Sequence, residues 1–247
     1  MNVMMSQLKP WLDTALGFVY PNVCQICNHE HATVVEGYVC ARCWQKVRFI
    51  KPPFCDRCGL PYEGEITAVF ECQNCREMEL HFRSARSAVV AGELVLDIIH
   101  RYKYQRALWF EPFLADILVR QAAPELARNK CDMIVPVPLH AAKRRERQFN
   151  QAERLAGQLS RATGIPLSTK LLKRVQPTRT QTMLTRPQRA ANVRNAFAPQ
   201  AGARLAGGRI VVFDDVFTTG ATTSACAKVL LAMGADDVCV WTVARGL

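Results

Sequence analysis

The chain has 247 residues, of which 49% are hydrophobic and 21% are charged. This balance is typical of a folded protein with a sizeable core, and it excludes disordered, collagen-like and polar low-complexity chains. The formal net charge of +11 is uneven, because residues 1–80 contain seven basic and nine acidic side chains, whereas residues 139–194 contain 13 basic side chains against Glu146 and Glu153. Such a basic stretch predicts a polyanionic partner, either nucleic acid or a phosphorylated small molecule, unless it is only a solvated helix face and loop.

Residues 1–22 are predicted to form a short amphipathic helix. Its apolar side chains recur at helical spacing and are Leu8, Trp11, Leu12, Ala15, Leu16 and Val19. Lys9, Pro10 and Asp13 interrupt the apolar stretch, which makes it a poor signal peptide. No apolar run in the chain approaches the ~18–20 residues that a membrane span requires. We therefore expect a cytoplasmic protein that does not insert into the membrane.

Residues 23–80 carry eight of the eleven cysteines, arranged as four pairs with a two-residue gap. The pairs are Cys24 with Cys27, Cys40 with Cys43, Cys55 with Cys58, and Cys72 with Cys75. A two-residue gap lets both sulfurs of a pair face one ion, and two pairs complete a tetrahedral thiolate site. The four pairs therefore predict a double zinc ribbon with two structural Zn²⁺ ions. Because thiolates fill every coordination position, zinc catalysis is not expected.

Three other roles for these cysteines fit the spacing less well. Disulfides form in oxidising compartments, a redox-active pair usually occurs once, and iron–sulfur ligands have other spacings. The pairs can share ions either sequentially or in an interleaved arrangement. We expect the sequential arrangement, because it closes the shorter loops. A module of roughly 50 residues with few aliphatic side chains depends on its metal ions for stability.

Residues 84–247 alternate strands with helices. The sequence predicts strands over residues 87–91, 132–137, 209–213 and 238–243, and helices over residues 94–104, 110–123, 148–163 and 222–233. Apolar strands that alternate with helices predict an α/β domain, in which helices cover both faces of a parallel sheet. Ligands of such domains bind at the carboxyl ends of the strands.

Two adjacent acids follow the strand predicted over residues 209–213. The segment that they open reads Asp214-Asp215-Val216-Phe217-Thr218-Thr219-Gly220-Ala221-Thr222. Gly220 allows the backbone to approach a ligand closely, and the amides of a helix start can hold a phosphate together with threonine hydroxyls. Adjacent carboxylates repel each other unless they bind hydroxyls or a hydrated cation. The segment therefore predicts a phosphate site rather than a plain strand–turn–helix with a threonine cap.

This segment resembles the PRPP-binding motif of type I phosphoribosyltransferases. The resemblance implies that Asp214 and Asp215 hold the ribose hydroxyls and that residues 218–222 hold the 5-phosphate. It also implies that a pyrophosphate, bridged by Mg²⁺, lies on the loop after the strand at Val135. Several purine-type members carry an acidic residue, which assists the base, where this chain has Thr218. No general base is therefore evident, and no catalytic residue is assigned.

A second resemblance covers essentially the whole chain. The sequence Val135-Pro-Val-Pro-Leu-His140, followed by Lys143, Arg147 and Gln148-Phe-Asn-Gln-Ala-Glu153, is similar to the signature of the ComF/GntX family, with Gln148 in place of the usual glycine. The element Ile99-His-Arg-Tyr-Lys103-Tyr104 also matches. The cysteine pairs, this signature and the PRPP-type segment occur in the order typical of the family.

The family resemblance implies a type I phosphoribosyltransferase-like fold that handles imported single-stranded DNA in natural competence. It also implies that the zinc module contacts other competence proteins, and that PRPP or a related phosphorylated ligand binds the domain. The implied pyrophosphate loop consists of Val137, Pro138, Leu139, His140, Lys143 and Arg147.

Basic residues after the proline-rich loop are the candidates for contacts with a DNA backbone. They are Lys143, Arg144, Arg145, Arg147, Arg179, Arg186, Arg189 and Arg194. The stretch from Arg174 to Arg194 has no long apolar period and is predicted to be a mobile basic loop, while Phe217 is the preferred candidate for stacking on bases.

Three functions compete: a DNA-handling protein on a PRPP-binding scaffold, an active Mg²⁺-dependent phosphoribosyltransferase with an unknown acceptor, and a PRPP-sensing regulator without turnover.

Overall fold

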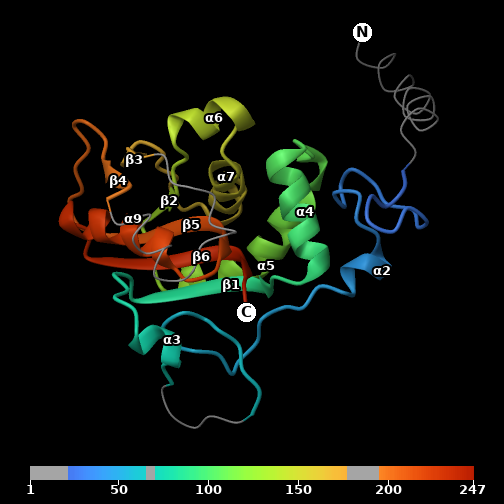
Figure 1. Cartoon of the computed structure of the whole chain (residues 1–247), viewed down its shortest axis with the longest axis horizontal. Helices are drawn as coiled ribbons and strands as arrows, with labels where there is room; N and C mark the ends of the chain where they lie inside the picture. Colours follow the sequence, from blue (N-terminus) through green and yellow to red (C-terminus); the bar gives the residue numbers. More distant parts are fainter. Residues whose placement is uncertain (1–21, 65–69, 177–194) are drawn as a thin grey trace.

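The computed structural model describes residues 22–64, 70–176 and 195–247, and Figure 1 shows how they are arranged. Apart from its last residue, the helix predicted over residues 1–22 lies outside these ranges. Four candidates for DNA contacts lie outside them as well, namely Arg179, Arg186, Arg189 and Arg194. Among the described residues, no helix combines the length and the apolar character that crossing a bilayer requires.

A central sheet of four parallel strands has the order β1-β6-β5-β2. The strands are β1 (Ser84–Val90), β2 (Met133–Pro136), β5 (Arg209–Phe217) and β6 (Asp237–Arg245). Most of their side chains are buried, because a parallel sheet covered on both faces has no solvated side onto which polar residues can alternate. The predicted parallel sheet and its four strands are confirmed.

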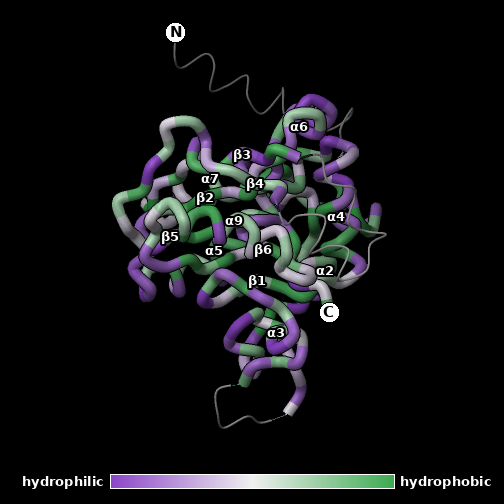
Figure 2. Tube along the Cα trace, turned by 60° about the vertical axis from the view of Figure 1, so that its left-hand side comes forward, coloured by the Kyte–Doolittle hydropathy of each residue, from purple (hydrophilic) through white to green (hydrophobic). Residues whose placement is uncertain are grey.

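Helices cover both faces of this sheet, with α5 and α7 on one face and α9 on the other. The helices of the domain are α4 (Glu93–Tyr104), the short 3₁₀ helix η1 (Leu108–Phe110), α5 (Glu111–Arg128), α6 (Ala141–Arg147), α7 (Gln151–Thr163) and α9 (Ala221–Ala232). Helix α7 buries Ala152, Leu155, Ala156 and Leu159, the apolar stripe that predicts it. Figure 2 shows hydrophobic residues gathered along the sheet and hydrophilic residues on α6.

The helix predicted over residues 148–163 begins three residues later than expected. Gln148 adopts a left-handed conformation (φ 64°) and ends α6. Asn150 then caps α7, because its side chain accepts a hydrogen bond from the N–H of Ala152 (3.1 Å). The Asn150 amide also donates to the carbonyl of Val137 (3.1 Å). These residues therefore attach α7 to the proline-rich loop instead of extending the helix.

Strand β5 runs four residues beyond its predicted end. Residues 214–217 stay paired with β6, and Phe217 lies opposite Arg245. The pairing satisfies backbone groups that would otherwise need other partners. The acid pair therefore lies on a strand, and the connection to α9 is shortened to residues 218–220.

A small antiparallel hairpin of β3 (Leu172–Arg174) and β4 (Phe197–Pro199) packs against α9. The predicted mobile loop from Arg174 to Arg194 is therefore wrong at its first residue, since Arg174 lies in β3 opposite Phe197. Three-residue strands are too short to show a periodic pattern, so the hairpin depends on tertiary packing that the sequence does not display.

The cysteine-rich modules lie at two separate places on the domain (Figure 1). We call residues 23–47, which contain α2 (Ala41–Trp44), the first ribbon, and residues 54–80, which contain α3 (Gln73–Arg76), the second ribbon. The cysteines of the first ribbon share a core with α4, α5 and α7, whereas those of the second ribbon share a core with α9 and the β3–β4 hairpin. The sheet separates these two cores.

The first ribbon contacts α5 closely. At Gly37 (φ 64°), a Cβ atom would lie 2.8 Å from the Cβ of Phe113, so only glycine fits there. The ring of Trp44 meets the ring of Phe113 edge-on, with centroids 5.1 Å apart. This packing joins the first metal-binding module to the core of the domain.

Both outer strands of the sheet have further backbone partners. Beside β1, the N–H of Ile50 donates to the carbonyl of Ala88 (3.0 Å), and the N–H of Val90 donates to the carbonyl of Arg48 (2.8 Å). Beside β2, Ile134 forms a parallel bridge with Leu167. The segment that connects the two ribbons is therefore paired with the sheet.

Candidate functional site

The eight ribbon cysteines form two metal-binding sites. In each, the four sulfurs lie within 4.8 Å of one another, and the sets are Cys24, Cys27, Cys40 and Cys43, and Cys55, Cys58, Cys72 and Cys75. The predicted sequential pairing is confirmed. The sulfurs of Cys27 and Cys40 are 3.8 Å apart, and those of Cys58 and Cys72 are 3.6 Å apart. Thiolates at roughly 2.3 Å from a tetrahedral Zn²⁺ have about this separation.

Backbone amides support the charge of these sulfurs. The N–H of Cys40 donates to Cys24 Sγ (3.3 Å), and the N–H of Cys72 donates to Cys55 Sγ (3.2 Å). Hydrogen bonds from outside the coordination shell hold thiolate ligands in place. The two four-cysteine sites therefore fit two structural zinc ions, and each is completed by thiolates alone.

A cavity of about 440 Å³ opens at the carboxyl ends of β2 and β5. All nine residues predicted to bind PRPP line it, namely Asp214, Asp215, Val216, Phe217, Thr218, Thr219, Gly220, Ala221 and Thr222. Four of the six residues predicted for the pyrophosphate loop line it as well, namely Val137, Leu139, Lys143 and Arg147. The structure thus brings the two predicted loops to one cavity, while their contacts with a ligand stay a prediction.

The turn between β5 and α9 is compact. Gly220 is left-handed (φ 79°) and a Cβ there would lie 2.5 Å from the ring of Phe217, so the turn requires glycine. Thr219 Oγ1 accepts a hydrogen bond from the N–H of Ala221 (3.4 Å), and Thr223 Oγ1 donates to the carbonyl of Gly220 (3.1 Å). The first turn of the twelve-residue α9 therefore lines the cavity, where the positive end of the helix dipole favours an anion.

Phe217 does not serve as an exposed platform for bases. Its side chain is 2% exposed, its ring meets that of Phe82 edge-on (6.0 Å between centroids), and the guanidinium of Arg245 lies 4.8 Å from its centroid. The prediction of base stacking by Phe217 is therefore wrong. The residue lies beneath the turn because β5 extends that far and turns its side chain into the core.

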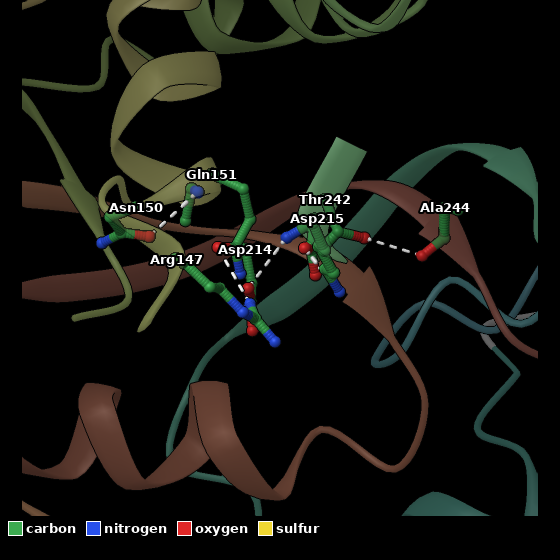
Figure 3. Close-up of polar contacts among 9 residues, drawn as sticks. Arg147, Asn150, Gln151, Asp214, Asp215, Thr242 and Ala244 are labelled. Carbon is green, nitrogen blue, oxygen red and sulfur yellow. Dashed lines mark hydrogen bonds and ion pairs between the residues drawn. The ribbon is translucent and has the colours of Figure 1, made fainter. Parts of the chain in front are cut away.

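The acid pair meets a lysine. Lys103 Nζ of α4 lies 2.6 Å from Asp215 Oδ2, and the N–H of Asp215 donates to Asp214 Oδ1 (2.9 Å); Figure 3 shows the two aspartates side by side on β5. Asp215 is buried, whereas Asp214 keeps partial access to the cavity. Because Lys103 already neutralises Asp215, a Mg²⁺ ion or a sugar hydroxyl would meet Asp214 first.

The pKa of Asp214 is raised from its usual 3.8 to about 7. Exclusion of water around the carboxyl is the main cause, and the charge of Asp215 adds to it, whereas Lys103 and Arg174 act in the opposite direction. A carboxyl with a shifted pKa in a cavity is a common feature of binding and catalytic sites. Asp214 is therefore the acid whose charge responds most readily to a ligand.

Three cations also line the cavity. Arg147 is buried, donates to Gln151 Oε1 (3.1 Å) and lies over the ring of Tyr104 (4.6 Å). Burial lowers the pKa of Lys143, and so do the positive charges of Arg174 and Arg147; burial also lowers the pKa of Arg174. Several like charges that line one cavity favour the binding of an anion there. We call Lys143, Arg147 and Arg174 the basic wall.

The remaining candidates within the described residues do not line this cavity. His140 begins α6, and its Nδ1 accepts a hydrogen bond from the N–H of Ala142 (3.3 Å), so it acts as a helix cap. Pro138 lines a separate cavity of about 230 Å³ together with Arg144. Arg144 and Arg145 are exposed on α6, and Arg144 pairs with Glu153 (3.5 Å). These two arginines are available to a larger partner at the surface.

Sequence reasoning missed two charged residues of the cavity. Arg174 belongs to a hairpin without a periodic signal, and Lys103 stands out in the sequence only as part of the family-like element of residues 99–104. Both are brought in from distant parts of the chain, and Lys103 lies more than 100 residues before its partner Asp215. A hydrophilic residue on α4 such as Lys103 gives no local indication that it faces the cavity.

The raised pKa of Asp214 predicts that the stability of the protein depends on pH. A carboxyl whose pKa is raised in the folded state holds its proton more tightly there than in the unfolded chain. Its contribution to the free energy of unfolding is therefore complete below about pH 3.8 and is lost as the pH rises through about 7. Relative to Asp214→Asn, the wild-type protein should therefore lose free energy of unfolding between these limits. Urea denaturation across that pH range measures the free energy of unfolding of both proteins. If the two free energies changed equally with pH, the prediction would be contradicted.

Comparisons with known proteins agree with this architecture. A family model of the double zinc ribbon domain matches residues 15–78. Competence protein F of Haemophilus influenzae is 31% identical over 221 residues, which cover 86% of this chain and 92% of that protein. The DNA utilization protein YhgH of Escherichia coli K12 is 29% identical over 230 residues (92% and 98%), and the competence protein ComFC of Bacillus subtilis is 26% identical over 247 residues (93% and 97%).

Solved phosphoribosyltransferases align with part of the chain. A purine phosphoribosyltransferase from Pyrococcus horikoshii is 20% identical over 54% of this chain and 83% of its own, with a TM-score of 0.33. An adenine phosphoribosyltransferase is 15% identical over 58% of this chain and 74% of its own, with a TM-score of 0.38.

Proposed function

This chain belongs to the family of competence protein F, ComFC and the DNA utilization protein YhgH, and from that membership we propose that it handles single-stranded DNA in the cytoplasm while its cavity binds PRPP together with Mg²⁺. The observation that supports PRPP as the ligand is the set of charged groups in the cavity. An acid pair, the turn of residues 218–220, which we call the phosphate-type turn, and three cations line the same cavity. A sugar that bears a monophosphate and a diphosphate matches this distribution of charge.

Each part of PRPP has a complementary group. The amides at the start of α9 and the adjacent threonine hydroxyls suit the 5-phosphate. Asp214 suits the ribose hydroxyls and the Mg²⁺ ion, which needs oxygen ligands. The basic wall suits the pyrophosphate, since Arg147 and Arg174 offer planar donor groups that match phosphate oxygens.

Calorimetric titration of the zinc-loaded protein with PRPP and Mg²⁺ tests this binding. We expect a saturable heat of binding with PRPP. Ribose 5-phosphate should bind more weakly, because it lacks the pyrophosphate that suits the basic wall. Absence of heat with PRPP at millimolar concentration would remove the proposal for the cavity and leave the proposal for DNA to its own test.

The DNA proposal rests on the exposed arginines of α6. Replacement of Arg144 and Arg145 by alanine should weaken binding to a single-stranded oligonucleotide. It should also reduce the slope of log K against log salt by about 0.7 for each lost phosphate contact. Fluorescence anisotropy over a salt series measures both. Arg128→Ala, at an exposed position near the amino end of β2, is the matched control. An equal loss in the control would contradict the role of α6.

An active phosphoribosyltransferase is the second candidate. The acid pair next to the phosphate-type turn supports it, and so does the pKa of Asp214 near 7, since a base works best when its pKa lies close to the ambient pH. Release of pyrophosphate from PRPP in the presence of candidate bases and amines would distinguish this enzyme from a protein that binds PRPP without turnover.

A further inference from the structure

Arg245 occupies the contact between the second ribbon and the turn that follows β5. It is the last residue of β6, and only 4% of its surface is exposed. Its Nη1 donates to the carbonyls of Phe217 (3.3 Å) and Thr218 (2.8 Å) and also to that of Gly246. The guanidinium thus holds the beginning of the turn, and it shares the carbonyl of Phe217 with the N–H of Gly246 (2.8 Å).

The same guanidinium reaches a metal ligand of the second ribbon. Arg245 Nε donates to the carbonyl of Cys58 (3.3 Å), and Nη2 lies 3.6 Å from Cys58 Sγ. A Zn²⁺ ion with four thiolates carries two net negative charges, so a buried cation beside one sulfur is favourable. The fork of donors on arginine allows it to serve both partners at once, which a lysine cannot do.

A second set of contacts connects the second ribbon with α9. Ser224 Oγ accepts a hydrogen bond from the N–H of His81 (3.0 Å) and donates to the carbonyl of Glu79 (3.3 Å). A small cavity is lined by Cys58, Thr218 and Arg245 together. The second metal site and the phosphate-type turn are therefore direct neighbours.

The geometry points to Arg245 as a positioning residue: we propose that Arg245, anchored on Cys58 of the second metal site, sets the orientation of the amides in the phosphate-type turn. In a planar trans peptide the carbonyl and the following N–H point in opposite directions. When Arg245 holds the carbonyls of Phe217 and Thr218, the N–H groups of Thr218 and Thr219 are aimed away from it. Loss of zinc from the second ribbon would release Cys58, and with it one anchor of the guanidinium.

For ligand binding, this inference rests on the proposed PRPP site. The test uses Arg245→Lys, which keeps the positive charge but loses the planar set of donors of the guanidinium. The matched control is Arg86→Lys, because Arg86 also ties the second ribbon to the sheet. Its Nη1 donates to the carbonyl of Asp56 (2.9 Å) and its guanidinium lies over Phe54 (4.6 Å). Both variants are first shown to retain two zinc ions per chain.

We expect Arg245→Lys to bind PRPP at least about tenfold more weakly than the wild type, as befits the loss of charged hydrogen bonds, and Arg86→Lys to bind it normally. Hydrogen exchange at residues 218–220 provides a readout without ligand. It should become faster in Arg245→Lys and stay unchanged in Arg86→Lys, even if PRPP does not bind at all. Unchanged exchange in Arg245→Lys, or equal changes in both variants, would overturn the inference.

Discussion

A variant in which Asp214 and Asp215 are both replaced by asparagine is expected to bind PRPP at least about 100-fold more weakly than the wild type. The two amides keep the volume of the acids but cannot hold Mg²⁺ or accept charged hydrogen bonds from ribose hydroxyls. Each such bond contributes about 1.5–3 kcal/mol, so the loss of two corresponds to two or more powers of ten. Calorimetry with PRPP and Mg²⁺ measures the change.

Inorganic pyrophosphate provides an internal control for this variant. Lys143, Arg147 and Arg174 remain in place, and Lys103 loses the carboxylate that it contacts at 2.6 Å, so the cavity becomes more positive. Binding of pyrophosphate alone should therefore persist. Asp237→Asn serves as the control variant, because Asp237 pairs with Arg83 (2.8 Å) at the amino end of β6. Unchanged PRPP affinity in the double variant would contradict the assignment of the acid pair.

Removal of both zinc ions is expected to produce the largest loss of stability in the molecule. Seven of the eight cysteine side chains are buried, and the two sets belong to the two cores on opposite faces of the sheet. Structural zinc contributes about 10–16 kcal/mol to the folding of isolated zinc-finger peptides. Even a third of that would lower the Tm of a protein of this size by roughly 10 °C or more.

A thermal scan before and after treatment with a strong chelator measures this loss. Cys24→Ser and Cys55→Ser should each lower the zinc content by one ion, because the sequential pairing makes the sites independent. Cys131→Ser is the matched control, since this partly buried cysteine belongs to neither site, and it should retain both ions. A chelated protein with an unchanged Tm would show that the ribbons fold without metal.

The features that could be predicted from the sequence are those with a strong local signal. The spacing of the cysteines indicates the metal sites, because a two-residue gap acts over only a few residues, and the shorter loops favour the sequential pairing over an interleaved one. The alternation of apolar strands and helices indicates the parallel sheet for a similar reason. The acid pair and the following turn also form one continuous segment of the sequence, so their residue types predict them together.

The errors arise where tertiary contacts override local patterns. The charge of Asp214 suggests the end of a strand, yet pairing with β6 extends β5 to Phe217. The same extension buries Phe217, which appears accessible when it is assigned to a loop. Gln148 ends a helix that its neighbours would continue, because Asn150 bonds to the proline-rich loop. Arg174 joins the cavity only through a hairpin of three-residue strands.

The pairing of the outer strands has a consequence for how other proteins can associate with this one. An unpaired outer strand invites another chain to add itself as a further strand, both in specific peptide binding and in aggregation. Here residues 48–50 accompany β1, and the N–H of Ser168 donates to the carbonyl of Ile134 (2.9 Å) beside β2. Within the described residues, a strand from another molecule could join at β1 only by displacing the connection between the ribbons. Strand-to-strand self-association of the central sheet is therefore discouraged.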